Sequence, residues 1–267
     1  MSTLQSEGNL AMTLSEQGNY EEAEEIEVRV LAARERVLGL EHPHTLAARG
    51  NWAKTLFARG DFRRAAAALR AVLAAETRVL GPEHPATLVT HTNLAVAIAS
   101  AGDEQLAARM CAELLPVCER VLGRDSLDTL TCAAALATTS ASGESGVKEM
   151  RRVFETHVRV LGDEHPLTVQ SAHALAKLLV RAGARDEARA LLARASRAAK
   201  SALGADHRGT RAIEADLARL ADSCGASKCA NCGASTTRVC GRCRAARYCS
   251  RECQRACWRA HAPSCAP

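Results

Sequence analysis

The C-terminal part of the chain contains most of its possible metal ligands. Seven cysteines and one histidine follow the spacing Cys229-x2-Cys232-x7-Cys240-x2-Cys243-x5-Cys249-x3-Cys253-x7-His261-x3-Cys265. Thiolate and imidazole are the usual ligands of structural zinc, and two ligands separated by two or three residues can share one ion. Eight ligands make two sets of four. The spacing therefore predicts two structural zinc ions, with no open position for a reacting water.

Metal binding explains these cysteines better than disulfide bonds do. The first residues, MSTLQSEGNL, lack a basic and hydrophobic signal region, and no run of about 18 apolar residues is present. We therefore expect an intracellular protein, cytoplasmic, nuclear or both, without membrane association. Thiols stay reduced in those compartments. So short a segment buries too little surface to fold alone, so metal is expected to supply much of its folding energy.

Basic residues are concentrated beside these ligands. From residue 224 onward the chain has eight basic residues and one acidic residue, a net charge of +7. A transcriptional or nucleic-acid-associated role is the alternative that this basic tail suggests. Seven thiolates and two Zn²⁺ ions together carry −3, however, which reduces the net charge to about +4. No base-reading helix or set of stacking aromatics accompanies the arginines, so protein partners are favoured over nucleic acid.

The ligand order, with RYCS, CQ and CW around it, resembles the MYND-type zinc finger over residues 229–265. The resemblance implies a cross-brace, in which the first and third ligand pairs hold one ion and the second and fourth pairs hold the other. It gives the first zinc ion the ligands Cys229, Cys232, Cys249 and Cys253. It gives the second zinc ion the ligands Cys240, Cys243, His261 and Cys265. Cys224 and Cys257 remain outside both sets, although Cys257 could compete with Cys253 one turn away.

MYND fingers are mostly protein-binding modules that take short proline-containing peptides. On this resemblance, the peptide contacts map to Gln254 and Trp258. The indole face would receive a proline ring, and the amide would bond the peptide backbone. The alternative is that Trp258 packs only in the small core of the finger.

The long segment before the finger is an internal repeat. Glycines recur at positions 39, 81, 123, 162 and 204, with spacings of 42, 42, 39 and 42 residues. A threonine column keeps the same register at Thr3, Thr45, Thr87, Thr129, Thr168 and Thr210. Two columns of small residues follow, one at Ala11, Ala53, Ala95, Ala137 and Ala176, the other at Ala23, Ala65, Ala107, Gly146 and Ala188. A period of this length is typical of solenoids.

Each unit of the repeat predicts two helices. In the unit from Thr45, the apolar residues at helical spacing are Leu46, Trp52, Ala53 and Leu56, then Phe62, Ala65, Leu69, Val72 and Val79. Gly60 predicts the turn between the helices, Gly81 the left-handed residue that ends the second, and Pro85 the first turn of the next. The small columns let neighbouring helices approach closely, so the pairs are expected to stack.

The segment GNWAKTLFARGDFRRA resembles the tetratricopeptide repeat, and the 42-residue period with its LGxEHPxT connector resembles the long variant of kinesin light chains. The resemblance covers residues 3–221 and implies five helix pairs plus a closing helix near 208–221. We therefore expect an all-α protein. It consists of a tetratricopeptide-type helical solenoid (1–221), a linker (222–228) and the two-zinc cross-brace MYND finger (229–265).

Three features depart from a regular repeat. The fourth unit is three residues short and has Ser140 where its equivalents are apolar, so we expect an irregular helix pair there. Pro116 lies inside a predicted helix and removes a backbone hydrogen bond, which predicts a bend. The first helix begins without a polar cap. Leu4, Leu10 and Leu14 are therefore expected to pack on another copy or a partner, unless the chain is a truncated product.

Several polar residues in the repeats have two possible roles. His42, His84 and His165 each follow a glutamate and could form metal or catalytic pairs, but their recurrence at the same connector favours a helix-capping role. The cysteines of the repeats are expected to be small apolar core residues: Cys111, Cys118 and Cys132.

An asparagine column lies six residues after the threonine column, at Asn9, Asn51 and Asn93. In peptide-binding tetratricopeptide proteins this position often faces the concave groove, where amides bond an extended peptide backbone. The resemblance thus implies a peptide in the groove of units one to three. The alternative is that these amides are satisfied by hydrogen bonds within the solenoid.

These features predict a zinc-binding adaptor or scaffold, whose solenoid groove and finger each bind a peptide segment of a partner. Linking two weak modules raises avidity. The chain has no nucleotide loop, hydrolase elbow or histidine-metal catalytic motif, so we expect no enzyme. Two alternatives are less favoured. A RING-like ubiquitin ligase conflicts with the late histidine and final spacings, and a lysine methyltransferase component would require the SET region, which the sequence lacks.

Overall fold

The computed structural model describes residues 2–139, 143–223, 227–228, 235–236, 251 and 255 of the chain. The chain divides into two compact units, residues 1–183 and 184–267, and each is described by itself. None of the helices in the described part has the length and apolar character needed to cross a membrane.

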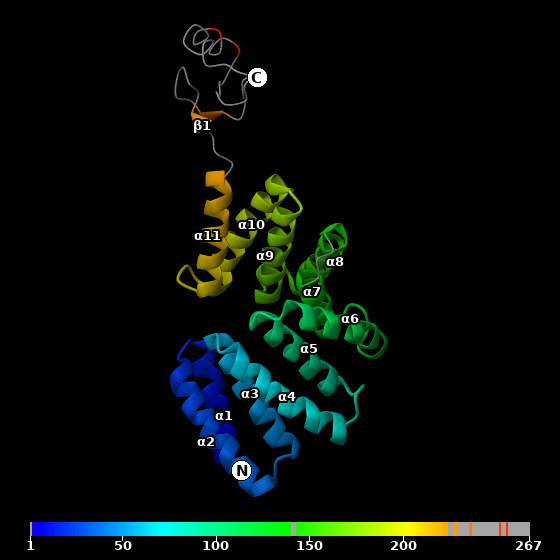
Figure 1. Ribbon diagram of the computed structural model, residues 1–267. Coiled ribbons are helices and arrows are strands. Elements are labelled where there is room, and N and C mark those ends of the chain that lie inside the picture. Colours follow the sequence, from blue (N-terminus) through cyan, green and yellow to red (C-terminus); the bar gives the residue numbers. More distant parts are fainter. Residues whose placement is uncertain are drawn as a thin grey trace. The chain divides into compact units, whose positions relative to one another are not determined.

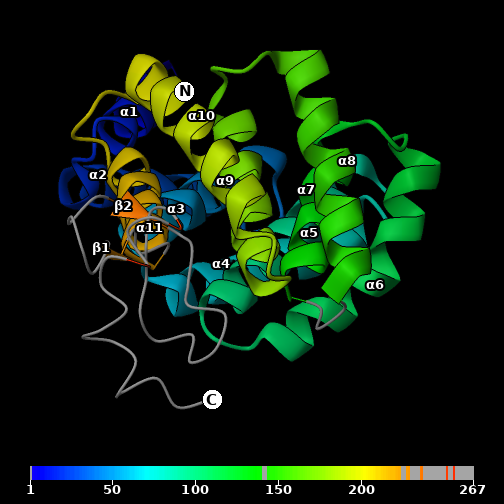
Figure 2. The same ribbon diagram turned by 90° about the horizontal axis from the view of Figure 1, so that it is seen from above.

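The described part of the first unit is helical throughout (Figure 1). Its elements are α1 (Ser2–Glu16), α2 (Tyr20–Leu38), α3 (Pro43–Arg59), α4 (Phe62–Val79), α5 (Pro85–Ser100), α6 (Glu104–Val121), α7 (Leu127–Thr139), α8 (Gly143–Leu161) and α9 (Pro166–Arg181). Each helix packs against the next, and α1 also touches α3, as α5 touches α7 (Figure 2). This order of contacts is that of a solenoid of helix pairs, and it confirms the predicted fold class.

The second unit contains two described helices, α10 (Arg185–Leu203) and α11 (Arg208–Ser223), which pack against each other. Two short antiparallel strands follow, β1 (Ser227–Lys228) and β2 (Ser235–Thr236), in which Ser227 pairs with Thr236. The sequence between these strands contains the first predicted cysteine pair.

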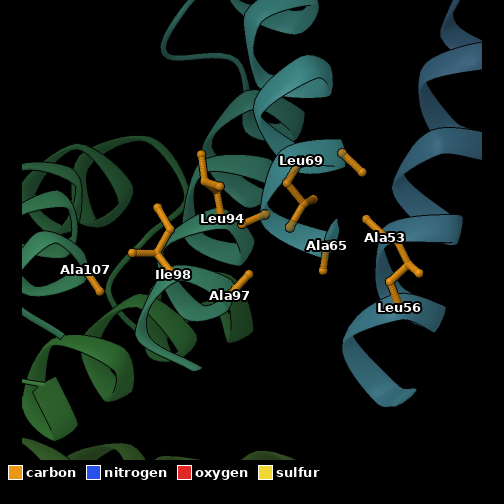
Figure 3. Packing of buried hydrophobic residues seen from close by; sticks show 10 residues of the cluster. Ala53, Leu56, Ala65, Leu69, Leu94, Ala97, Ile98 and Ala107 are labelled. Atoms are coloured by element: carbon orange, nitrogen blue, oxygen red, sulfur yellow. The ribbon is translucent and has the colours of Figure 1, made fainter. Parts of the chain in front are cut away.

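The small-residue columns lie where helices meet. Ala53 and Ala65, one from each column, are at most 1% exposed in the cluster that joins α3, α4, α5 and α6 (Figure 3). Leu56, Leu69 and Ile98 fill the space around them in the same cluster. Alanine permits this close approach because its side chain adds one methyl group to the helix surface. The predicted role of the two columns is therefore confirmed.

Two members of the threonine column close a connector between units. Thr87 is buried, and its Oγ1 donates a hydrogen bond of 2.9 Å to the carbonyl oxygen of Gly81. Thr210 repeats this contact with Gly204 at 2.8 Å. Gly81 has a φ of +95°, a backbone conformation that favours glycine, as predicted. The other members do not make this contact: Thr45 and Thr168 Oγ1 are buried without a partner in the described structure, Thr129 Oγ1 accepts from Ser126 Oγ, and Thr3 is exposed.

The connector histidines cap the helices that follow them. The Nδ1 atom of His84 accepts a hydrogen bond of 3.2 Å from the backbone amide of Ala86, and Pro85 occupies the first turn of α5. The same bond recurs at 3.1–3.2 Å for His42, His165 and His207. At the equivalent position of the fourth unit, Ser126 Oγ accepts from the amide of Thr129 at 3.2 Å. The capping prediction is confirmed, and the alternative of a metal or catalytic pair is not needed.

The apolar residue Val79 does not belong to the core. Val79 is 49% exposed, and its equivalents Val37, Val121 and Val160 are exposed as well. Each of them lies in the last turn of its helix, next to the connector. Exposed ion pairs lie at the same edge, Arg120 with Glu83 at 2.5 Å and Arg159 with Asp125 at 2.8 Å. Ion pairs this exposed contribute little to stability.

The first helix packs within the chain more than its sequence suggested. Leu4 and Leu14 are partly buried against the cluster of Ala11, Ile26 and Val30. Only Leu10 of the three leucines is strongly exposed, at 52%. Packing on another molecule, one of the two alternatives that the sequence left open, is thus not needed to cover Leu4 and Leu14, which α2 covers in part.

The remaining features are the buried cysteines, the proline inside α6 and the end of α7. The three repeat cysteines are fully buried, as predicted, and Cys132 Sγ donates to the carbonyl oxygen of Cys111 at 3.7 Å. Pro116 lies inside α6, which continues past it to Val121. Helix α7 ends at Thr139, and Ser140 lies outside the described residues.

The cap bond yields a prediction. His84→Ala removes the acceptor for the Ala86 amide and should lower the free energy of unfolding by about 1 kcal/mol. His84→Ser, which copies Ser126, should retain most of that stability. Urea unfolding followed by circular dichroism measures both. Equal midpoints for the two variants would show that the histidine does not act as a cap.

Candidate functional site

A small pocket lies between α1 and α3, with α2 as its floor. Its volume is about 40 Å³. Its lining residues are Gln5, Gly8, Asn9, Met12, Glu27, Val30, Arg34, Ala48 and Asn51. The structure thus brings two members of the asparagine column, Asn9 and Asn51, to one recess. Asn93 occupies the same repeat position in α5 and does not line this pocket.

The asparagine amides are available for binding. Within the described residues, the side chains of Asn51 and Asn93 make no hydrogen bond, and both are partly buried. Asn9 Oδ1 accepts a hydrogen bond of 3.1 Å from Gln5 Nε2, which leaves the Asn9 amide nitrogen as a donor. At Asn51 and Asn93, the described part of the solenoid contains no hydrogen bond of the kind that the alternative requires.

Glu27 is the unexpected residue of the pocket. It is 5% exposed, and its Oε1 accepts a hydrogen bond of 3.0 Å from Thr55 Oγ1. Its Oε2 is buried and has no partner in the described structure. Burial raises the pKa of Glu27 to about 7, the Thr55 hydrogen bond opposes this rise, and the charge of Glu24 adds to it.

Arg34 forms the opposite end of the pocket. It is 8% exposed, and its guanidinium donates to the carbonyl oxygen of His44 at 2.8 Å and to Gln5 Oε1 at 3.2 Å. It lies seven residues after Glu27, about 10 Å along the axis of α2. The pocket therefore has a carboxyl group with one unpartnered oxygen, Glu27 Oε2, and a guanidinium that donates to His44 and Gln5.

Sequence reasoning missed Glu27 and Arg34, although the repeat contained a signal for both. The equivalents of Glu27 in later units are apolar and buried: Leu69, Cys111, Met150 and Leu192. The equivalents of Arg34 are also buried: Glu76, Cys118, His157 and Ala199. A charged residue at a column of core residues marks a position that packing alone does not explain.

The Arg34 column contains further unpaired polar atoms. Glu76 Oε2 and both ring nitrogens of His157 are buried without partners in the described structure. Burial lowers the pKa of His157, and the nearby His165 adds to this effect.

A wider and more open recess lies between α2 and α4 over α3. Its volume is about 350 Å³, and Leu31, Trp52 and Ala68 contribute to its wall. Arg64 lies 5.6 Å from the centre of the Trp52 ring. The cations of this recess are already paired, Arg49 with Glu35 and Arg64 with Glu24. It is therefore less suited than the first pocket to receive a polar ligand.

The predicted finger residues are outside the described part of the structure. This applies to all eight zinc ligands, to both predicted peptide contacts, Gln254 and Trp258, and to Cys224 and Cys257. Among the residues that are described, no group of three or more histidine, cysteine or acidic side chains is arranged to hold a metal ion. The three buried cysteines of the repeats thus form no metal centre.

Comparisons with known proteins agree with both predicted modules. The family model of the MYND finger matches residues 229–265, which implies zinc binding. The model of the tetratricopeptide repeat matches residues 3–44, 45–86, 87–128 and 168–209. The unmatched residues 129–167 form the fourth unit, which was predicted to be irregular. No curated protein matches the chain.

Solved structures show the same solenoid. Two crystal structures from Podosopora anserina, titled as kinesin light chain with nearly identical TPR-like repeats, are 27% identical to this chain. The first, a Q17M form, has a TM-score of 0.58 and covers 75% of this chain and 96% of its own. The second has a TM-score of 0.56 and covers 76% of this chain and 97% of its own.

BtubC (BKLC) from P. vanneervenii is 17% identical to this chain, with a TM-score of 0.50, and covers 83% of this chain and 88% of its own. At this identity it supports the fold alone. The repeat matches extend over more than half of the 267 residues, and helix pairs occupy the same residues in the structure. The chain belongs to the tetratricopeptide repeat family.

Proposed function

We propose that this protein is a non-catalytic adaptor that binds a peptide segment of one partner in the groove of its first three repeats and a second partner through its zinc finger. Tetratricopeptide repeats and MYND fingers generally bind proteins. The observation that carries the proposal is the pair of unpartnered amides of Asn51 and Asn93 at one repeat position of α3 and α5. Each amide offers a donor and an acceptor, which matches the needs of an extended peptide backbone.

The groove is built to hold these amides in register. The caps of α3 and α5 and the closely packed alanines fix where each helix starts and how near its neighbour lies. Asn9 enters the same recess as Asn51, and Gln5 fixes the orientation of its side chain. A peptide lying across α1, α3 and α5 would meet one asparagine from each helix.

The finger would supply the second binding surface. Its donor set of seven thiols and one imidazole fits zinc, which stabilises small domains that cannot bury enough surface. We propose two structural ions, the first held by Cys229, Cys232, Cys249 and Cys253. The second would be held by Cys240, Cys243, His261 and Cys265. Gln254 and Trp258 would then face a proline-containing peptide. The residues between the solenoid and the finger, within 222–228, would act as the linker.

The groove proposal predicts a loss of binding without a loss of stability. Asn51→Ala combined with Asn93→Ala should weaken binding of a groove peptide about tenfold, because two hydrogen bonds to the peptide are lost. The urea midpoint should change little, since neither side chain has a partner to lose. Asn19→Ala, an exposed amide outside the pocket, is the matched control. Isothermal titration with captured partner segments tests this, and unchanged affinity in the double variant would contradict it.

The zinc assignment predicts two zinc ions per folded chain, measured by native mass spectrometry. Cys243→Ser should lower this number, and Cys257→Ser should leave it at two because Cys257 belongs to neither set. A strong chelator should remove the metal while the helical circular dichroism of the repeats persists. A wild-type ratio of zinc ions to folded chains other than two contradicts the ligand assignment.

The finger contact predicts that Trp258→Ala removes a set of partners with proline-containing segments. A pull-down from cell lysate with zinc-loaded protein, read by mass spectrometry, compares this variant with the wild type. If the captured proteins are the same and the variant still holds two zinc ions, Trp258 belongs only to the core of the finger.

A further inference from the structure

Glu27 lies at a repeat position where the later units have core residues. The later units have Leu69, Cys111, Met150 or Leu192 there, and each of these side chains is buried. A buried carboxylate costs free energy unless a donor or cation compensates it. The fold therefore does not require a glutamate in α2, and an apolar residue would satisfy the packing better.

The surroundings of Glu27 leave one oxygen without compensation. Thr55 donates a single hydrogen bond of 3.0 Å to Oε1, whereas Oε2 is buried and unpartnered in the described structure. Arg34, about two turns of α2 from Glu27, donates to the carbonyl oxygen of His44 and to Gln5 Oε1. The carboxylate of Glu24 adds negative potential, which contributes to the raised pKa of Glu27. This end of the pocket thus favours a donor that carries positive charge.

We propose that the pocket receives a lysine or arginine side chain of the peptide bound in the groove, and that Glu27 pairs with its cationic end. The proposal rests on the groove function proposed above and specifies its ligand. A pocket of about 40 Å³ has room for a slender head group but not for an aromatic ring. Val30 and Met12 can cover the aliphatic stem of such a side chain. Asn9 and Asn51 flank the pocket, so the basic residue would lie between two backbone contacts.

The proposal implies that Glu27 is kept at the expense of stability. Glu27→Leu, which copies Leu69 and Leu192, should raise the urea midpoint of the repeats at neutral pH, because an unpaired buried carboxylate is replaced by an apolar side chain. The same variant should lose the preference for basic residues. Gain of stability together with loss of binding separates a ligand contact from a structural role.

The test first selects binding peptides. It then measures how strongly the effect of a basic peptide residue depends on Glu27. A library of random dodecapeptides displayed on phage is selected on the zinc-loaded full chain, and the selected peptides are synthesised. Each basic residue is replaced in turn by norleucine, which keeps the stem of lysine and removes its charge. At one position this change should weaken binding at least tenfold in the wild type. It should have little effect in Glu27→Gln.

Glu76→Gln is the matched control, because Glu76 is also a buried carboxylate with an unpartnered Oε2 and does not line this pocket. It should bind the peptides as the wild type does. If the peptides depend on Asn51 and Asn93 but not on Glu27 or a basic residue, the cation site is wrong and the groove function stands. If no selected peptide depends on Asn51 and Asn93, both proposals are overturned.

Discussion

Close approach of neighbouring helices is the constraint on which this solenoid depends. At each helix crossing the chain places an alanine, or the single glycine Gly146, and these residues are almost completely buried. Any larger side chain would push the helices apart, and the leucines around the crossing would lose contacts that dispersion and burial supply. Aromatic residues make up only 3% of the chain, so alanines at the crossings and aliphatic side chains such as Leu56 and Leu88 form this core.

The connectors make this spacing regular from unit to unit. A histidine or serine caps the next helix, and the connector glycine adopts positive φ. At Thr87 and Thr210 a threonine hydroxyl also donates to the carbonyl oxygen of that glycine. Each contact is worth little alone. Together they set the starting residue of α3 and α5, and with it the height at which Asn51 and Asn93 lie. The relative placement of these two asparagines is therefore a consequence of how the repeat is closed.

Buried polar residues work against this stable framework. Glu27 and Arg34 are buried in α2, and Glu76 and His157 retain buried atoms without partners in the described structure. Such groups lower stability, and natural chains retain them most often where function needs them. In the first repeats the unpaired carboxylate lies beside the available amides. In the proposed function, this recess would combine charge with hydrogen bonding and would select among peptides, because a ligand lacking the basic side chain would leave Glu27 uncompensated.

The sequence by itself determined the repeat period, the helix pairs, the buried small residues and the capping histidines, because each of these depends on residues close together in one unit. It also determined the MYND finger match, since the ligand spacing is local. Only the tertiary structure decided that Leu4 and Leu14 pack on α2 and that Val79 is exposed, because both depend on which helix covers a side chain. It alone brought Asn9, Glu27 and Asn51 from three helices to one pocket and left Glu27 Oε2 unpartnered. Pairing between distant side chains is a property of packing, and a linear pattern does not contain it.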